Sequence, residues 1–180
     1  MAMTLITTNT SSNAASSSFT SSIDSTYKLY IFKVLSLNPA TDDANFTFQV
    51  STNGGSSYGI AITSSAFAAV HEEDDGEASL FYASGQDLAQ GTGYQQLMNE
   101  MSNAADSGGV ATLHLFNPSS TTYAKNWLCS AVYMDNAYDS SAARDLYTQG
   151  YVNSTSAVNA IQFKMSSGNF DGTIKMYGVS

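Results

Sequence analysis

Cysteine is nearly absent from this sequence of 180 residues. Cys129 is the single one, so a disulfide within the chain is excluded. It lies in an apolar run at 127–133. We expect a small buried side chain there, because a reactive thiol needs an electropositive surrounding. A site built from paired cysteines is excluded too.

Basic residues are also scarce. The sequence has 6 Lys and Arg against 15 Asp and Glu, which gives a formal net charge of -9. Nucleic-acid binding relies on clustered Lys and Arg that neutralise phosphates, and no such cluster exists here. The same deficit argues against anionic membrane surfaces. An acidic surface instead favours solubility and resists non-specific adhesion.

Long apolar runs and an N-terminal targeting signal are missing as well. No run approaches the roughly 20 residues that a membrane-spanning helix requires. The first basic residue is Lys28, so the charged start of a secretory signal peptide is lacking. We therefore expect synthesis in the cytoplasm, without a signal peptide and without a membrane partner.

The sequence does contain many short segments typical of strands. Aromatic and β-branched residues dominate 27–35, and apolar residues alternate with polar ones at 45–51. An Asn-Gly-Gly turn at 53–55 predicts a hairpin between 45–51 and 58–63. Leu97, Met98 and Met101 are spaced as in a helix, which predicts one short helix within 95–105. Further strands are predicted at 110–116, 127–134, 157–165 and 172–179.

Short strands separated by Gly, Asn and Ser turns predict an all-β fold. We expect an antiparallel, jelly-roll-like β-sandwich with at most one or two short helices, spanning residues 23–180. Residues 1–22 are rich in Ser and Thr and predict a flexible arm ahead of that domain. The sizeable apolar residues near the N-terminus are candidates for docking on a partner. They are Leu5, Ile6, Phe19 and Ile23.

Residues able to perform catalysis do not form a recognisable motif. The acidic loop at 71–77 lacks the alternating ligands and fixed glycine of a calcium loop. His71 belongs to that loop, and His114 alternates with apolar residues in a predicted strand. We therefore predict a protein that is not an enzyme and holds no metal or cofactor. A glycoside-cleaving enzyme that uses two turn carboxylates is a weaker hypothesis.

Tyrosine is abundant, with 11 residues, and several tyrosines lie between 123 and 151, some of them in predicted loops. Exposed aromatic rings stack on sugar rings and anchor interfaces. A carbohydrate-binding module that contacts host-surface glycans is thus the alternative to a purely structural role. Its candidate contacts are Tyr123, Tyr138, Tyr147 and Tyr151.

Several turn and strand segments resemble those of a known group of proteins. These segments are 23–27, 37–43, 46–58, 160–163, 167–170 and 172–178. Together they resemble small virion structural proteins of tailed bacteriophages, of the marine and aquatic type, described as tail-fibre-like or capsid-decorating domains. The resemblance covers both ends of the domain and leaves its middle unmatched. It implies a fold and a setting, and no functional residue is carried over from it.

The resemblance and the composition together predict a bacteriophage virion structural protein displayed on the capsid or tail. Its partners would be other virion proteins and further copies of itself. We expect a homo-oligomer, with a trimer as the first guess because fibres and many capsid decorations have three-fold symmetry.

Overall fold

The computed structural model describes residues 2–135 and 142–180. All the regular secondary structure assigned in these ranges consists of β-strands. The strands are β1 (Met3–Ala14), β2 (Ser17–Phe19), β3 (Leu29–Pro39), β4 (Ala44–Ser51), β5 (Ile62–Glu72), β6 (Ala78–Tyr82), β7 (Gln95–Met101), β8 (Gly109–Phe116), β9 (Lys125–Asp135), β10 (Ala142–Val152), β11 (Ala160–Met165) and β12 (Phe170–Val179).

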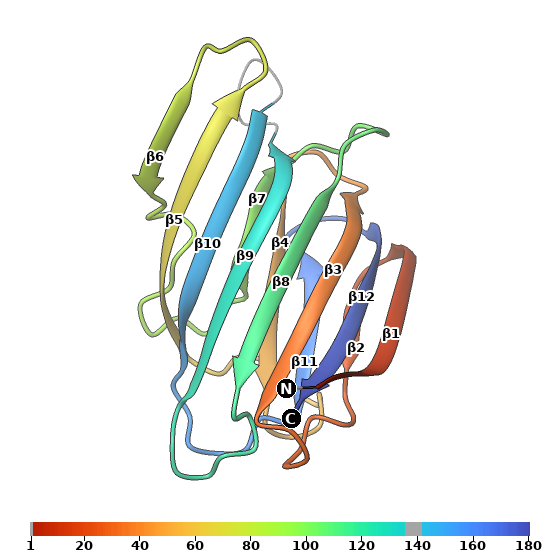
Figure 1. Cartoon of the computed structure of the whole chain (residues 1–180), viewed down its shortest axis with the longest axis vertical. Helices are drawn as coiled ribbons and strands as arrows, with labels where there is room; N and C mark the ends of the chain where they lie inside the picture. Colours follow the sequence, from red (N-terminus) through yellow and green to blue (C-terminus); the bar gives the residue numbers. More distant parts are fainter. Residues whose placement is uncertain (1, 136–141) are drawn as a thin grey trace.

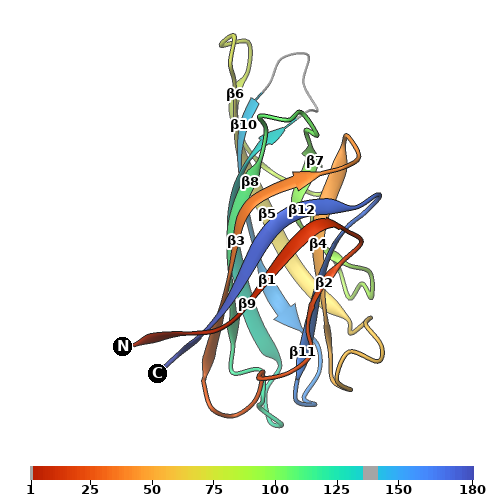
Figure 2. The ribbon, with the colours of Figure 1, turned by 90° about the vertical axis from the view of Figure 1, so that its right-hand side faces the viewer.

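The strands form two layers, seen edge-on in Figure 2. The large sheet has the order β6-β5-β10-β9-β8-β3-β12-β1 and faces the viewer in Figure 1. The small sheet behind it has the order β7-β4-β11-β2. All strand pairings are antiparallel. Within the described residues, the two layers are joined by one pair of bridging residues, Met101 of β7 and Asp135 of β9.

The core fills the space between the two sheets because alternate side chains of each strand point inward. In β9, Trp127, Cys129 and Ala131 are buried while the residues between them are more exposed. Aromatic rings from both layers meet in this core. The ring of Phe48 lies edge-on to that of Trp127, with centroids 5.0 Å apart. Such contacts lock the layers together beyond the area that they bury.

The far side of the small sheet is covered by the chain's own loops. Gln49 of β4 is fully buried, and its amide Nε2 donates to the carbonyls of Ile60 and Gly93. The ammonium of Lys164 on β11 lies 4.2 Å from the centre of the Tyr94 ring. This layer is therefore sealed by residues of its own chain.

The expected all-β, antiparallel fold is confirmed. The helix predicted within 95–105 is wrong, because 95–101 form β7. A register shift where β4 pairs with β7 leaves Leu97 as an extra residue between Gln96 and Met98, so that the neighbours Leu97 and Met98 are both buried. Two successive buried residues followed by Met101 give the same apolar spacing in the sequence as one face of a helix, which explains the wrong prediction. The described residues contain no helix long and apolar enough to cross a membrane.

The predicted hairpin between 45–51 and 58–63 is also wrong. β4 lies in the small sheet and β5 in the large one, and the two do not pair. The Asn-Gly-Gly segment does turn the chain, since Gly54 and Gly55 have φ values of 71° and 86°. It starts a loop that crosses from one layer to the other.

A flexible arm was predicted for 1–22, but the described residues of that segment, 2–22, are part of the sandwich. β1 pairs with β12 along most of its length, and β2 pairs with β11. Composition misled here because backbone hydrogen bonds along a sheet edge do not need apolar side chains. Phe19 at the end of β2 is 3% exposed and contacts the rings of Phe32 and Phe163.

Replacing Phe19 with Ala should therefore lower the free energy of unfolding by about 3 kcal/mol or more, as for other buried aromatic residues. The matched control is Leu5→Ala in β1, where the side chain is 51% exposed and should change stability by less than about 1 kcal/mol. Urea unfolding measures both. Equal, small effects would mean that residues 1–22 do not belong to the folded core.

Candidate functional site

The candidate site is the outer face of the large sheet, the face turned away from the small sheet. Residues paired directly across neighbouring strands share a face. One continuous row of such pairs crosses all eight strands and is called here the central row. From β6 to β1 it runs Tyr82, Phe67, Tyr147, Ser130, Thr112, Lys33, Lys175, Thr8.

Large apolar side chains gather on this outer face. Of the twelve that are exposed in the described residues, eleven lie on it by strand register, and Tyr123 in the loop after β8 is the exception. They are Met3, Leu5, Leu35, Phe67, Leu80, Tyr82, Val110, Leu128, Val132, Tyr147 and Tyr151. Such a concentration of exposed apolar side chains on one face indicates a surface that contacts another molecule.

Aromatic residues occupy one end of the central row. The rings of Phe67 and Tyr147 are stacked, with centroids 5.1 Å apart and planes 8° from parallel. Tyr82 is the next residue in the row, and its hydroxyl donates to Asp87 over 2.5 Å. Tyr151 lies four residues beyond Tyr147 on the same strand face. These side chains offer flat apolar area at the β6 end of the sheet.

Two lysines occupy the other end of the row. Lys33 of β3 and Lys175 of β12 are direct cross-strand partners. The chain has only six basic residues, and two others, Lys125 and Arg144, are buried. The outer face is thus aromatic on one side and cationic on the other.

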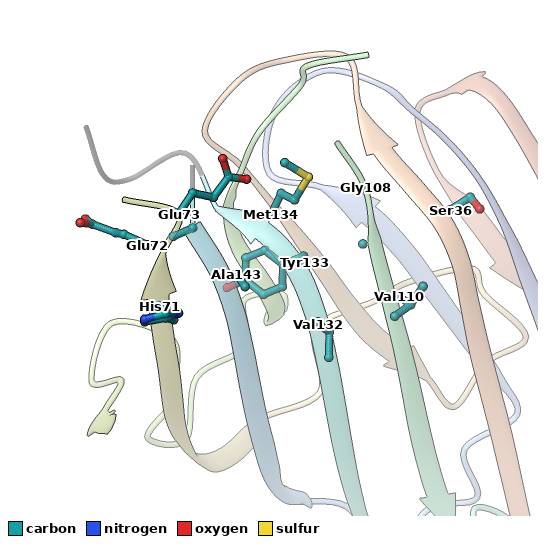
Figure 3. A pocket seen from close by; sticks show the side chains of 12 residues that line it. Ser36, His71, Glu72, Glu73, Gly108, Val110, Val132, Tyr133, Met134 and Ala143 are labelled. Carbon is teal, nitrogen blue, oxygen red and sulfur yellow. The ribbon is translucent and has the colours of Figure 1, made fainter. Parts of the chain in front are cut away.

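A hollow of about 570 Å³ lies at one end of the outer face (Figure 3). Val110 and Val132 project into it from β8 and β9, with Glu73 on one side and Ser36 on the other. A second hollow of about 330 Å³ continues from the same two valines to Lys33. The surface is therefore a shallow, mainly apolar depression along the strands and not a deep pocket.

A further hollow of about 570 Å³ lies away from this face, between the small sheet and the loop before β7. It is polar, and amides and carboxylates line it, among them Asn45, Gln96 and Glu100. Such groups hydrogen-bond polar ligands.

The predicted docking residues are separated by the fold. Leu5 lies on the outer face, and Ile6 is partly buried against the core. Phe19 and Ile23 are each 3% exposed within the core. The docking role predicted for Phe19 and Ile23 is therefore wrong, because these two buried side chains have no surface to offer a partner.

The predicted glycan contacts are divided as well. Tyr147 and Tyr151 lie together on the outer face of β10. Tyr123 is 69% exposed in a loop. Tyr138 lies outside the described residues. Near Tyr151, the amide Nε2 of Gln90 is 3.5 Å from the tyrosine hydroxyl, so a polar group borders the aromatic one.

The titratable groups considered for catalysis are dispersed. His71, near the end of β5, contacts Asp75 of the following exposed acidic turn over 3.0 Å. Burial lowers the pKa of His114, and nearby Lys33 lowers it further. Burial raises the pKa of the Cys129 thiol, so the thiol is protonated at neutral pH. Within 2–135 and 142–180, no group of three His, Cys, Asp or Glu residues could hold a metal ion.

A buried ion pair lies on the inner side of the large sheet. Arg144 Nη1 donates to the carboxylate of Asp135, and their side chains are 5% and 0% exposed. The Phe81 ring covers the guanidinium at 5.5 Å. Tyr133 lies nearby, donates to Asn99 over 2.7 Å and has its pKa raised by burial. This polar network supports the sheet from behind the candidate site.

Sequence reasoning missed most of the outer face. Phe67, Lys33 and Lys175 belong to three strands that are far apart in the chain. Alternation alone places each on one side of its strand, and only strand order brings them into one row. The exposed fraction of the valines in β8 and β9 had no sequence signal either, since valine is common in any strand.

Comparisons with known proteins add no relatives: the chain matches no family model, no curated protein and no solved structure. The site is therefore defined by its own geometry.

Asp135→Asn should lower the free energy of unfolding by about 3 kcal/mol, because it removes the buried counter-charge of Arg144. The guanidinium then relies on the more distant, half-exposed carboxylate of Glu100, 3.8 Å from Nη1. Asp106→Asn is the matched control in the exposed loop before β8, with an expected change below about 0.5 kcal/mol. Chemical unfolding followed by tryptophan fluorescence measures both, since Trp127 is buried in the core. Equal stability of the two variants would contradict a structural role for the pair.

Proposed function

We propose that this chain is a non-enzymatic structural protein of a bacteriophage virion, displayed on the capsid or tail, and that it assembles through the outer face of its large sheet. The observation that carries the proposal is the gathering of eleven exposed apolar side chains on that one face. The small sheet offers no equivalent, because its own loops cover it.

The strand order supports the fold that the resemblance implies. β1, β12, β3 and β8 lie opposite β2, β11, β4 and β7, which is the order produced when four antiparallel strand pairs are rolled up together. We propose that these eight strands are a jelly-roll core. Under this proposal β9, β10, β5 and β6 widen one sheet of the core and enlarge its outer face.

The location on a virion rests on the resemblance of the turn and strand segments at both ends of the chain. Low charge and a self-sealed back layer suit a component that is soluble before assembly and adhesive on one face only. Under this proposal, the chain is made in the bacterial cytoplasm and becomes part of the particle by assembly.

Purified particles of the phage that encodes the chain test the proposal by quantitative mass spectrometry. The chain should be present in many copies per particle. Val132→Glu should reduce its incorporation about tenfold or more, since it places a charge in an apolar interface. Lys164→Glu, on the small sheet, should incorporate normally. Absence of the wild-type chain from particles would contradict the proposal.

A second candidate function is recognition of host-surface glycans by Tyr147 and Tyr151. The observation that favours it is the amide of Gln90 beside Tyr151, since sugar sites combine aromatic faces with hydrogen-bonding amides. On a glycan array, binding should be lost in Tyr151→Ala and kept in Tyr123→Ala. Equal signals from both variants and the wild type would exclude this surface as the glycan site.

A further inference from the structure

The lysine pair on the outer face is unfavourable in an isolated chain. Like charges placed directly opposite each other on neighbouring strands repel. Lys33 and Lys175 are such a pair, and within the described residues neither has a carboxylate in salt-bridge range. In a chain with a net charge of -9, acidic neighbours could easily have been placed beside them. Their position indicates that a partner supplies the compensating contact.

Groups that can provide such a contact lie at the other end of the same row. An ammonium group binds over the face of an aromatic ring, more strongly when the contact excludes water. Phe67 and Tyr147 present stacked rings there, and Asp145 adds a carboxylate on the same face of β10. The two ends of the central row are thus chemically complementary.

The positions of these residues are symmetric about the middle of the sheet. The middle of the eight strands falls between β8 and β9. Counted outward from there, Lys33 and Tyr147 lie on the second strands, β3 and β10. Lys175 and Phe67 lie on the third strands, β12 and β5. All four belong to one row, so a two-fold rotation about an axis parallel to the strands exchanges the two ends.

We propose that the outer face binds a second copy of this chain, related by a two-fold axis parallel to the strands between β8 and β9. Lys33 of one copy then lies against Tyr147 of the other, and Lys175 lies against Phe67. Each contact occurs twice, as in any isologous interface. The inference rests on the proposed assembly role of this face and names its partner.

Residues beside the axis fit the same arrangement. Val110 and Val132 are cross-strand neighbours on β8 and β9 and are exposed by 47% and 48%. Under the two-fold rotation each valine of one copy faces the other valine of its partner. Thr112 and Ser130 are exchanged in the same way. The axis is therefore lined by an apolar pair and a pair of small hydroxyl side chains, and the charged and aromatic contacts lie on either side of it.

The available area suffices for a stable dimer. Eight strands at about 4.8 Å spacing, with about seven residues along each strand except the five-residue β6, span roughly 34 Å by 23 Å. That is on the order of 800 Å² for each copy, the area that one partner of a standard interface buries. Two sheets packed face to face lie about 10 Å apart with strands within about 30° of each other, which places facing side chains in contact.

Light scattering coupled to size-exclusion chromatography, together with sedimentation equilibrium, tests the proposal on the full chain. The wild type should be a dimer. Lys33→Glu and Tyr147→Lys should each weaken the dimer about tenfold or more, because each alters two symmetric contacts. Lys164→Glu makes the same charge change on the small sheet and should leave the dimer intact.

Mixing the two weakened variants tests whether position 33 of one copy faces position 147 of the other. In a mixed dimer, Glu at position 33 faces Lys at position 147, and the second contact is the native one. An equimolar mixture of Lys33→Glu and Tyr147→Lys should therefore dimerise within about threefold of the wild type, measured by native mass spectrometry with a tag on one variant. Unfolding midpoints of both variants verify that each is folded.

A monomeric or trimeric wild type, or a mixture that fails to recover the dimer, would overturn the two-fold pairing. A trimer would instead agree with the three-fold assembly expected from sequence. The proposed function is tested separately by incorporation into particles. If the chain enters particles without forming this dimer, the proposed function stands and the two-fold pairing is contradicted. If the chain forms the dimer but is absent from particles, the pairing stands and the proposed function is contradicted.

Discussion

The alternation of side chains along the strands of the large sheet is the constraint on which the rest of the structure depends. Each residue faces either the small sheet or the outside, and a shift by one residue would exchange the two sets. Inward positions carry the aromatic core around Trp127 and Phe48. Outward positions carry valine, leucine and tyrosine where a solvated sheet would carry polar residues.

This choice of outward residues distinguishes the two sheets. The small sheet presents polar side chains such as Gln49, which are bonded to loops of the same chain. On the large sheet, no loop within 2–135 and 142–180 covers Val110 and Val132 in this way, and both valines border the open hollow. The difference concentrates the exposed apolar side chains on one face, while a polar hollow lined by Asn45, Gln96 and Glu100 lies beside the other sheet. The buried Arg144–Asp135 pair lies behind that face and ties β10 to β9 from the inside.

Strand composition was predictable from sequence, and strand partners were not. The aromatic segment at 27–35 and the alternating segment at 45–51 overlap β3 and β4. The hairpin failed because a Gly-rich turn reverses the chain locally without deciding which sheet the next strand joins. The segment 1–22 was misjudged because an edge strand such as β1 is held by backbone bonds to β12, to which Ser and Thr contribute as well as apolar residues.

The candidate site was predictable only in part. Tyr147, Tyr151 and Leu5 were named from their types, and the fold does place them on the outer face. Phe67, Lys33 and Lys175 required the register of five neighbouring strand pairs, which no local pattern specifies. Phe19 and Ile23 had the composition of docking residues but are buried, because apolar residues in a polar segment serve equally well as anchors to a core.

Hydroxyl-radical footprinting of the assembled protein, compared with a dilute sample, tests most directly whether the outer face is the contact surface. Radicals oxidise exposed tyrosine and leucine side chains, and mass spectrometry locates the oxidised residues. The account predicts that Tyr147 and Leu128 become protected on assembly while Tyr123 reacts equally in both samples. Protection of Tyr123, with Tyr147 and Leu128 unchanged, would contradict it.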